Sequence, residues 1–448
     1  MKQNYDFINE PTRKALFRMF LPMMIGMLLN FAYNIVDTLW VGNLMGDTAL
    51  AALTNAAPIV TLTYSFGMGI TNGMGILLSN HLANNDKKEE EKIISSTLVM
   101  TIVLAIILVS VLEFSINGIL SMMNTKPETF GYARDYLMVY LVGMIPSFIF
   151  CHITSMLRCY GDSIFQMISV LVTSILNAIL DPIMISAIGF HGAATATVFS
   201  QVVSLILLIF YCRKKQYFHL KLRSFKKEYV SPVAKLSIPT VIQQCTPSLS
   251  SAVLTSCVNN FGVVAMAAYG IVNKLDMILF MPATVLNMVL TPIIGYCIGG
   301  KRKDRASDYM KLSIRFSIIV VTICGLLLLI FSKPISGIFG CSAETSALVQ
   351  HCIMFLVWGY LFNAVTQCFM GKINGYGQPG KGMIITVLNH IVIRIPFSII
   401  LSNTFLGLDG IWITLLCSFI IAFICAFVID RRIAAQKADT KIKIYNYK

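Results

Sequence analysis

The feature that most constrains this chain is a series of twelve apolar runs, each long enough to cross a lipid bilayer as a helix. A bilayer-spanning helix needs about 20 largely apolar residues, and its backbone polar groups must be satisfied within the segment. Alternation with a period of two, which would indicate strands, is absent. We therefore predict an all-α integral membrane protein with helices at residues 15–41, 49–80, 93–113, 132–156, 163–187, 192–212, 233–258, 264–298, 312–332, 346–370, 382–403 and 409–429.

The composition excludes a water-soluble fold. Hydrophobic residues make up 56% of the chain and charged residues only 12%, whereas soluble domains carry about 25% charged residues. The twelve cysteines form no CxxC pair, and no histidine stands at a metal-ligand spacing from them. We expect no disulfide framework, no metal site, no cofactor and no catalytic residues.

The distribution of basic residues predicts the orientation. With the N-terminus inside, 30 of the 35 lysines and arginines fall in inner segments, and only Lys126, Arg134 and Lys333 fall in outer loops. Lysine and arginine concentrate on the cytoplasmic side of membrane proteins. Both termini are therefore predicted to be cytoplasmic in a multi-pass protein of the inner (plasma) membrane. The net charge of +14 reflects this topology and the contact with lipid, so we expect no nucleic-acid partner.

The second half of the chain repeats the first. At one constant shift Tyr160 and Gly161 match Tyr376 and Gly377, and at nearly the same shift glycines match before the last span of each half. Because six spans per half is an even number, the repeats have the same orientation and are related by a pseudo-two-fold axis along the membrane normal. We predict two parallel six-helix bundles in a monomer that rock to alternate access to a central cleft. The predicted parts are 1–212 (first bundle), 213–232 (cytoplasmic linker), 233–430 (second bundle) and 431–448 (cytoplasmic tail).

Ionisable residues at membrane depth are the candidate functional groups, because such a charge costs at least about 2.5 to 3.5 kcal/mol. Asp37 and Asp181 lie at a similar predicted depth below the outer boundary, and Asn177 lies one helical turn from Asp181. This trio can hold a proton between two carboxylates or offer several oxygens to Na⁺. The alternatives are structural: Asp37 as an interfacial residue, and Asp181 as part of a helix bend at Pro182.

The second bundle carries its own charged residues near mid-depth. Asp276 and Arg394 are predicted to form an interhelical ion pair, because an unpaired charge there is costly. Lys274 points about 200° away from Asp276 on the same helix and requires another partner. A structural pair and a role in substrate binding or coupling both remain open. Polar, aromatic and methionine side chains can repack around different ligands, although most such residues in membrane helices pack or face lipid. The candidates for a substrate cleft are Met27, Phe31, Tyr33, Met68, Gln243, Gln244 and Met281.

Several segments together resemble the multidrug and toxic compound extrusion (MATE) family, with the bacterial DinF-like and related branch as the nearest match. They are NIVDTLWVGNLMGDTALAAL in the first span, LNAILDPIMI in the fifth, GFHGAATATVFSQ in the sixth, FMPATVLNMVLTPIIGYCIGG in the eighth, and RCYGDS and INGYGQP after the fourth and tenth. The resemblance implies an antiporter that exports amphipathic, often cationic organic molecules against H⁺ or Na⁺. It also implies that coupling occurs at Asp37, Asn177 and Asp181. Spans seven and ten lack the acidic residues that bind cation in some members.

Two other functional classes remain as alternatives. A flippase for a lipid-linked saccharide would have a similar bundle, but more spans or a cleft rich in basic residues would favour it, and neither is evident. A membrane-embedded acyltransferase needs a catalytic histidine and acid, whereas the six histidines are dispersed without an HxxxxD or HExxH pattern. We therefore predict a transporter and not an enzyme.

Overall fold

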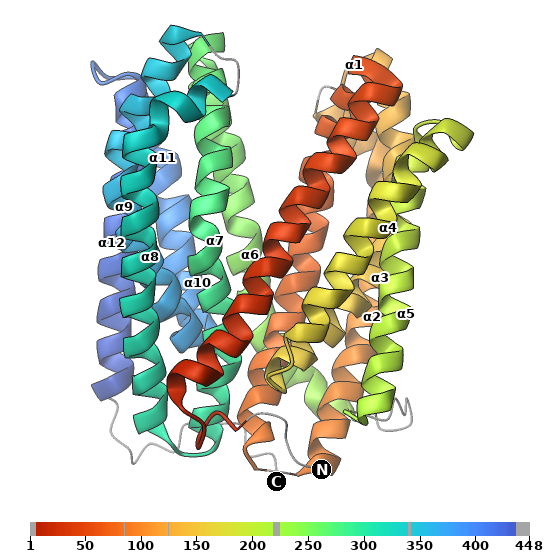
Figure 1. Ribbon diagram of the computed structural model, residues 1–448, viewed down its shortest axis with the longest axis vertical. Coiled ribbons are helices and arrows are strands. Elements are labelled where there is room, and N and C mark those ends of the chain that lie inside the picture. The colour runs from red at the N-terminus through yellow and green to blue at the C-terminus, as the bar shows by residue number, and fades with distance from the viewer. Residues whose placement is uncertain (1–5, 85, 124, 218–224, 339–341, 436–448) are drawn as a thin grey trace. The chain divides into compact units, whose positions relative to one another are not determined.

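The computed structural model describes residues 6–84, 86–123, 125–217, 225–338 and 342–435. This part of the chain consists of helices and short connections (Figure 1). The first half contains α1 (Thr12–Leu82), α2 (Lys87–Met122), α3 (Pro127–Cys159), α4 (Ile164–Ile188) and α5 (His191–Lys215). The second contains a short 3₁₀ helix, η2 (Lys227–Tyr229), then α6 (Val230–Asn259), α7 (Val263–Gly299), α8 (Lys303–Ile338), α9 (Ala343–Gly375), α10 (Pro379–Val387), η3 (Leu388–Arg394), α11 (Ile395–Ser402) and α12 (Leu408–Ala435).

These helices confirm the predicted all-α membrane fold. Eleven segments of the described chain are long and apolar enough to cross a membrane. They include both parts of α1, Thr12–Gly46 and Thr48–Leu82, which meet at a kink at Gly46. One further segment, Pro379–Ser402, combines α10, η3 and α11. Helix α6 lies at the seventh predicted span but is not among the eleven, since residues such as Gln243 and Gln244 make it more polar.

The backbone carries the predicted repeat. In the described residues, glycines with positive φ occur in three pairs: Gly46 and Gly262, Gly161 and Gly377, and Gly189 and Gly407. The members of each pair are separated by the shifts that the sequence repeat shows. Each pair marks the same connection in the two halves. Glycine adopts this conformation without the steric cost that a side chain would add, so the repeated glycines preserve the same turns.

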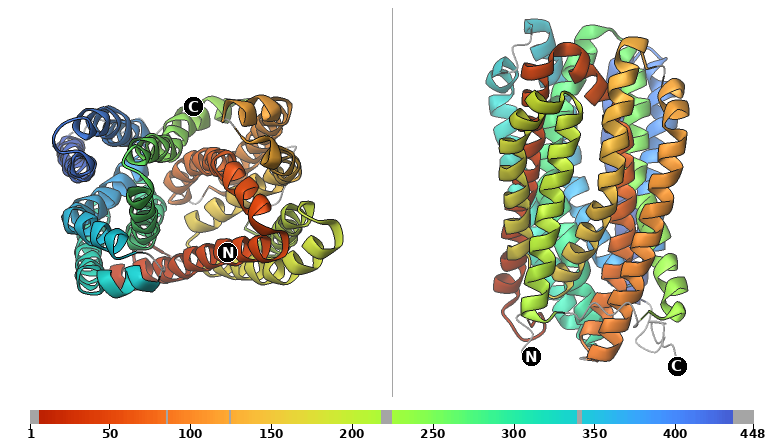
Figure 2. Two further views of the ribbon diagram at one scale, coloured as in Figure 1. Left: turned by 90° about the horizontal axis from the view of Figure 1, so that it is seen from above. Right: turned by 90° about the vertical axis from the view of Figure 1, so that its right-hand side faces the viewer.

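The helices divide into two compact units. Unit 1 comprises residues 1–6 and 17–241, and unit 2 comprises 7–16 and 242–448. The division within the chain therefore falls inside α6, after the predicted linker at 213–232. Residues 218–224 of that linker and 436–448 of the predicted tail lie outside the described residues. Most long helices within each unit run along a common direction, whereas the first part of α1 is oblique to them (Figure 2).

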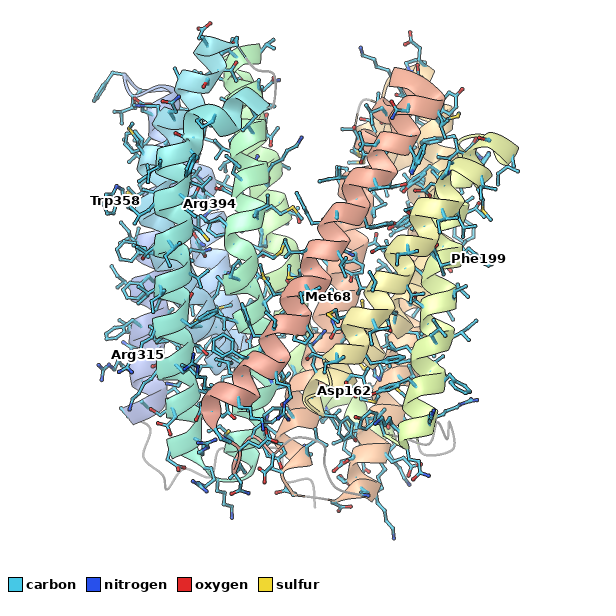
Figure 3. The ribbon with its side chains drawn as sticks, viewed as in Figure 1. Met68, Asp162, Phe199, Arg315, Trp358 and Arg394 are labelled. Carbon is cyan, nitrogen blue, oxygen red and sulfur yellow. The ribbon has the colours of Figure 1, made fainter. Side chains whose placement is uncertain are left out.

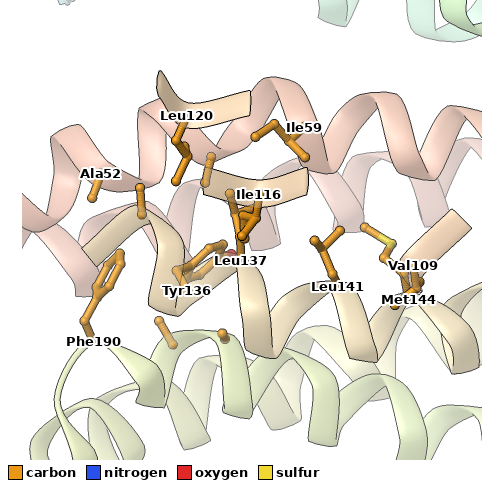
Figure 4. Packing of buried hydrophobic residues seen from close by; sticks show 14 of the residues in the cluster. Ala52, Ile59, Val109, Ile116, Leu120, Tyr136, Leu137, Leu141, Met144 and Phe190 are labelled. Carbon is orange, nitrogen blue, oxygen red and sulfur yellow. The ribbon is translucent and has the colours of Figure 1, made fainter. Parts of the chain in front are cut away.

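The core of unit 1 draws on α1 to α5, and most of its residues come from the second part of α1, α2 and α3. Ala52, Ile116, Leu137 and Phe190 belong to one buried cluster (Figure 4). Small side chains from α1 let the helix backbones approach closely, and large residues from α2 and α3 fill the remaining space. Such packing drives helix association in membranes, where lipid is as apolar as the protein interior.

The predicted linker is fastened to unit 1 at both of its described ends. After α5, the Tyr217 hydroxyl donates a hydrogen bond to Asp162 at 2.8 Å. Before α6, the Lys226 backbone N–H donates to the Ser96 hydroxyl at 2.9 Å, and Tyr229 donates to Glu89. These contacts explain why the first part of α6 belongs to unit 1.

In unit 2, α9 packs against α7, α8 and α12. The unit also includes the start of the chain, which the sequence did not predict. The Arg305 guanidinium donates to Thr12 Oγ1 at 3.0 Å and to the Glu10 carbonyl, and the Tyr309 hydroxyl donates to the Phe7 carbonyl at 3.0 Å. Phe7 itself is buried. These bonds hold residues 7–16 in unit 2, although the rest of α1 belongs to unit 1.

Candidate functional site

The predicted acidic residues of the first half meet inside unit 1. Asp37 on α1 and Asp181 on α4 are 8% and 0% exposed, and their carboxyl groups interact directly. Two carboxylates this close favour a state in which they share one proton or a bound cation, because two adjacent negative charges repel one another.

Asn177 connects this pair to α5. Its side-chain amide donates to Asp181 Oδ1 at 3.0 Å and lies 3.3 Å from Thr197 Oγ1. The first contact is the one expected from the spacing of one helical turn, whereas Thr197 was not predicted. The sequence feature that could have indicated Thr197 is the run of Ala and Thr in GAATATVFSQ, which places a hydroxyl group on the small-residue face of the span.

Aromatic hydroxyl groups surround the same site. Tyr33, one turn before Asp37 on α1, donates to Thr197 Oγ1 at 3.3 Å. Tyr140 on α3 interacts electrostatically with Asp37 and hydrogen-bonds Gln201 on α5. The site therefore draws polar groups from α1, α3, α4 and α5. Tyr33 was predicted as a cleft residue, and the structure makes it a member of this network.

The carboxyl pair retains uncommitted oxygens. Asp37 Oδ1, Asp181 Oδ2 and Asn177 Oδ1 are buried and have no hydrogen-bond partner among the described residues. Buried polar atoms are normally satisfied, so three such oxygens in one place indicate a site suited to a proton or a small cation. Carboxylate and amide oxygens are hard ligands that suit ions of this kind.

The turn between α4 and α5 fixes the spacing of the site. Gly192 packs so closely on α4 that an added Cβ would lie 2.2 Å from the Met184 carbonyl oxygen. Only glycine permits this approach. It brings the first turns of α5, including Thr197, against the end of α4 that carries Asp181.

In unit 2 the predicted ion pair is not formed. Asp276 on α7 accepts a hydrogen bond from the Tyr360 hydroxyl, and Arg394 Nε donates to Ser418 Oγ at 3.1 Å. The two charges interact electrostatically, but no ion pair joins them in the described chain. Each group has a neutral hydrogen-bond partner instead, and a role for the two in substrate binding or coupling stays a prediction. Lys274 is exposed on α7, whereas Asp276 on the same helix is partly buried.

The predicted substrate-cleft residues have different surroundings. Met281 is only 2% exposed and packs in the interior of unit 2, so it does not face a ligand in this conformation. Gln243 donates to the Pro379 carbonyl at 2.7 Å and thus braces the start of α10. The others are partly exposed and remain predictions: Met27, Phe31, Met68, which is labelled in Figure 3, and Gln244.

Two repeated helical units with buried ionisable groups inside are typical of a membrane transporter. The chain belongs to the MatE family. The family model matches residues 22–183 and again 239–400, and these two stretches of equal length, one in each half, confirm the internal repeat. The resemblance to this family found in the sequence is therefore confirmed, and so is the prediction of a transporter.

Similar proteins include transporters with different described substrates. The chain is 25% identical over 434 residues to the "Probable multidrug resistance protein YoeA" of Bacillus subtilis (strain 168), covering 94% of each chain. It is 23% identical over 452 residues to an "FAD transporter" of Shewanella oneidensis, covering 98% of this chain and 99% of that one. The solved structure of a mutant Vibrio cholerae MATE transporter, VcmN, has a TM-score of 0.90 at 20% identity and covers 95% of this chain and 98% of that one. This likeness establishes the fold alone.

Proposed function

We propose that the protein is an antiporter that exports amphipathic, often cationic organic molecules in exchange for H⁺ or Na⁺. The observation that carries the proposal is the direct interaction of Asp37 with Asp181, beside Asn177, in the interior of unit 1. The multidrug resistance protein among its relatives supports the substrate class.

The carboxyl pair has a defined role in this mechanism. A cation taken up from outside neutralises one negative charge, and its release inside restores that charge. Moving one positive charge across 100 mV involves about 2.3 kcal/mol, so one entering cation balances the export of one singly charged substrate. The pair links the two movements because a bound cation neutralises its charge on the way in, and a cationic substrate compensates the restored negative charge on the way out.

We also propose that the two repeat-related units rock to alternate access to the substrate. Rigid-body movement of repeats around a fixed site is the usual mechanism for such folds. The positive-inside pattern supports a plasma-membrane protein with both termini in the cytoplasm.

The test is transport in proteoliposomes with a fluorescent organic cation and an imposed pH or Na⁺ gradient. Asp37→Asn preserves the shape of the side chain and removes its charge, so gradient-driven transport should fall at least about a hundredfold, the lower end of the loss expected when a proton-transfer group is removed. Asp135→Asn is the matched control, since this carboxyl is half exposed and lies beside His191. Wild-type transport by both Asp37→Asn and Asp181→Asn would show that coupling lies elsewhere.

The same assay identifies the coupling ion. Na⁺ coupling uses the amide oxygen of Asn177 as a ligand, whereas a proton requires only the carboxyl groups. Asn177→Ala should therefore raise the Na⁺ concentration for half-maximal transport if Na⁺ is the ion. A pH gradient alone should drive wild-type transport if H⁺ is the ion.

A further inference from the structure

Unit 2 contains a second polar cluster that the coupling mechanism does not use. It consists of Asp276 on α7, Tyr360 on α9, Asn389 and Arg394 on η3, and Ser418 on α12. These residues lie far apart in the sequence, on four helical segments, and the fold of unit 2 brings them together. Arg394 lies among the helices of unit 2, whereas Arg315 projects from the unit's outer side (Figure 3).

The segment that carries Arg394 is a π-helix of seven residues, Leu388–Arg394. π-helices are rare and occur frequently at functional sites. Their hydrogen bonds join residues i and i+5, so Arg394 lies about one turn from Asn389. In unit 1, Asp181 lies one α-helical turn from Asn177. Both halves carry a Leu–Asn sequence in their fifth span, and the charged residue about one turn after it is Asp181 in unit 1 and Arg394 in unit 2.

The charges of this cluster are not paired with each other. Arg394 uses Nε to bind Ser418, but its Nη2 is buried without a hydrogen-bond partner among the described residues. Nearby on η3, Asn389 is 6% exposed and its Oδ1 also lacks a partner in the described chain. A buried guanidinium N–H group without an acceptor is costly and is suited to a carboxylate, which arginine binds through charge-assisted hydrogen bonds.

Aromatic rings enclose the two charges. The Arg394 guanidinium lies 4.8 Å from the centre of the Phe419 ring. Phe280 packs edge-on against both Tyr360 and Phe419. Asp276 and Arg394 are both partly exposed. The cluster thus contains an acceptor and a donor separated by more than ion-pair distance, with aromatic rings packed beside them.

We propose that this cluster binds aromatic zwitterions, with the ligand's carboxylate on Arg394 and its cationic group on Asp276. A molecule carrying only a positive charge would leave Arg394 unpaired. The zwitterion satisfies both residues and keeps the site neutral, which lowers the cost of burying the charges. That such a zwitterion is a transported substrate rests on the proposed function. Its binding to the cluster requires no ion gradient and can be measured separately.

The test is equilibrium binding to the full chain in lipid nanodiscs, measured by fluorescence polarisation. The probes are a rhodamine with a free carboxylate, which is a zwitterion, and its methyl ester, which is only a cation. Wild-type protein should bind the carboxylate form more tightly. Arg394→Gln should weaken binding of the carboxylate form by at least about tenfold, as expected for a lost charge-assisted hydrogen bond, and should change binding of the ester less than about twofold.

Two further variants keep the proposal falsifiable. Asp276→Asn should weaken both probes alike, because both carry the cationic group. Ser418→Ala removes the partner of Arg394 Nε while keeping the charge, so it should reduce only carboxylate binding even if Arg394→Gln does not fold. Arg315→Gln is the control and should bind both probes as the wild type does. Equal effects of Arg394→Gln or Ser418→Ala on the two probes, or wild-type preference for the ester, would overturn the proposal. Failure of coupling alone would leave these binding results unchanged.

Discussion

The turn before the last span of each half allows the structure to be tested at two equivalent glycines. Real Cβ atoms essentially never approach another heavy atom within 3.0 Å. A Cβ on Gly192 would lie 2.2 Å from the Met184 carbonyl oxygen, far inside this limit. A Cβ on Gly410 would lie 2.6 Å from the Leu401 carbonyl oxygen, which is a smaller overlap. Because both neighbours are backbone atoms, neither overlap can be relieved by rotating a side chain.

Overpacking of this kind costs about 1 to 3 kcal/mol. We expect Gly192→Ala to lie near the upper end of that range and Gly410→Ala near the lower end. Gly118→Ala and Gly131→Ala are matched controls with the opposite expected sign, since a Cβ there meets nothing within 4 Å. Replacing glycine by alanine inside a helix stabilises it by about 0.5 to 1 kcal/mol.

The measurements are thermal unfolding in detergent and gradient-driven transport. Gly192→Ala should also impair coupling, because it shifts α5 against α4 and separates Thr197 from Asn177. Gly410→Ala acts in unit 2, so it should lower stability while leaving this contact intact. If Gly192→Ala unfolds at the wild-type temperature, the close approach of α5 to α4 is incorrect. Loss of coupling in both variants to the same extent would show that stability alone explains the defect.

Two other predictions follow from the described contacts. Arg305→Ala removes the hydrogen bonds to Glu10 and Thr12, so hydrogen exchange of residues 7–16 should become about tenfold faster or more. Arg302→Ala, at an exposed pair with Asp304, is the control and should leave that rate unchanged. Unchanged exchange in Arg305→Ala would refute the role of Arg305. Phe405 is 97% exposed in the connection before α12, on the predicted outer side. In a cysteine-free background, an impermeant thiol reagent added outside intact cells should label Phe405→Cys but not Ser231→Cys at the start of α6. The reverse pattern would contradict the predicted topology.

The architecture could be predicted because it depends on features that a linear sequence displays directly. Apolar runs marked the spans, and paired glycines marked the repeated turns, since both follow from local backbone requirements. The contact between Asn177 and Asp181 was predictable for the same reason, because residues four apart share a helix face.

Contacts between helices were harder to predict. Depth along a span brought Asp276 and Arg394 to the same level, but depth does not specify the direction of a side chain around its helix. The π-helix at residues 388–394 inserts a residue into the turn and rotates the residues that follow it, and no hydropathy pattern reveals such an insertion. Thr197 was missed because a threonine on an alanine-rich face is compatible with packing alone.

The two halves therefore share a scaffold but not a chemistry. The positive-φ glycines keep the same connections in both units, and each half places a charged residue one turn after a Leu–Asn pair in its fifth span. In unit 1 that residue is Asp181, which together with Asp37 leaves oxygens free for an exchangeable cation. In unit 2 it is Arg394, a cation fixed to the protein, so this position cannot take part in ion exchange. Under the two proposals, unit 1 couples the ion, and the opposite charge of Arg394 lets unit 2 recognise an anionic group of the substrate.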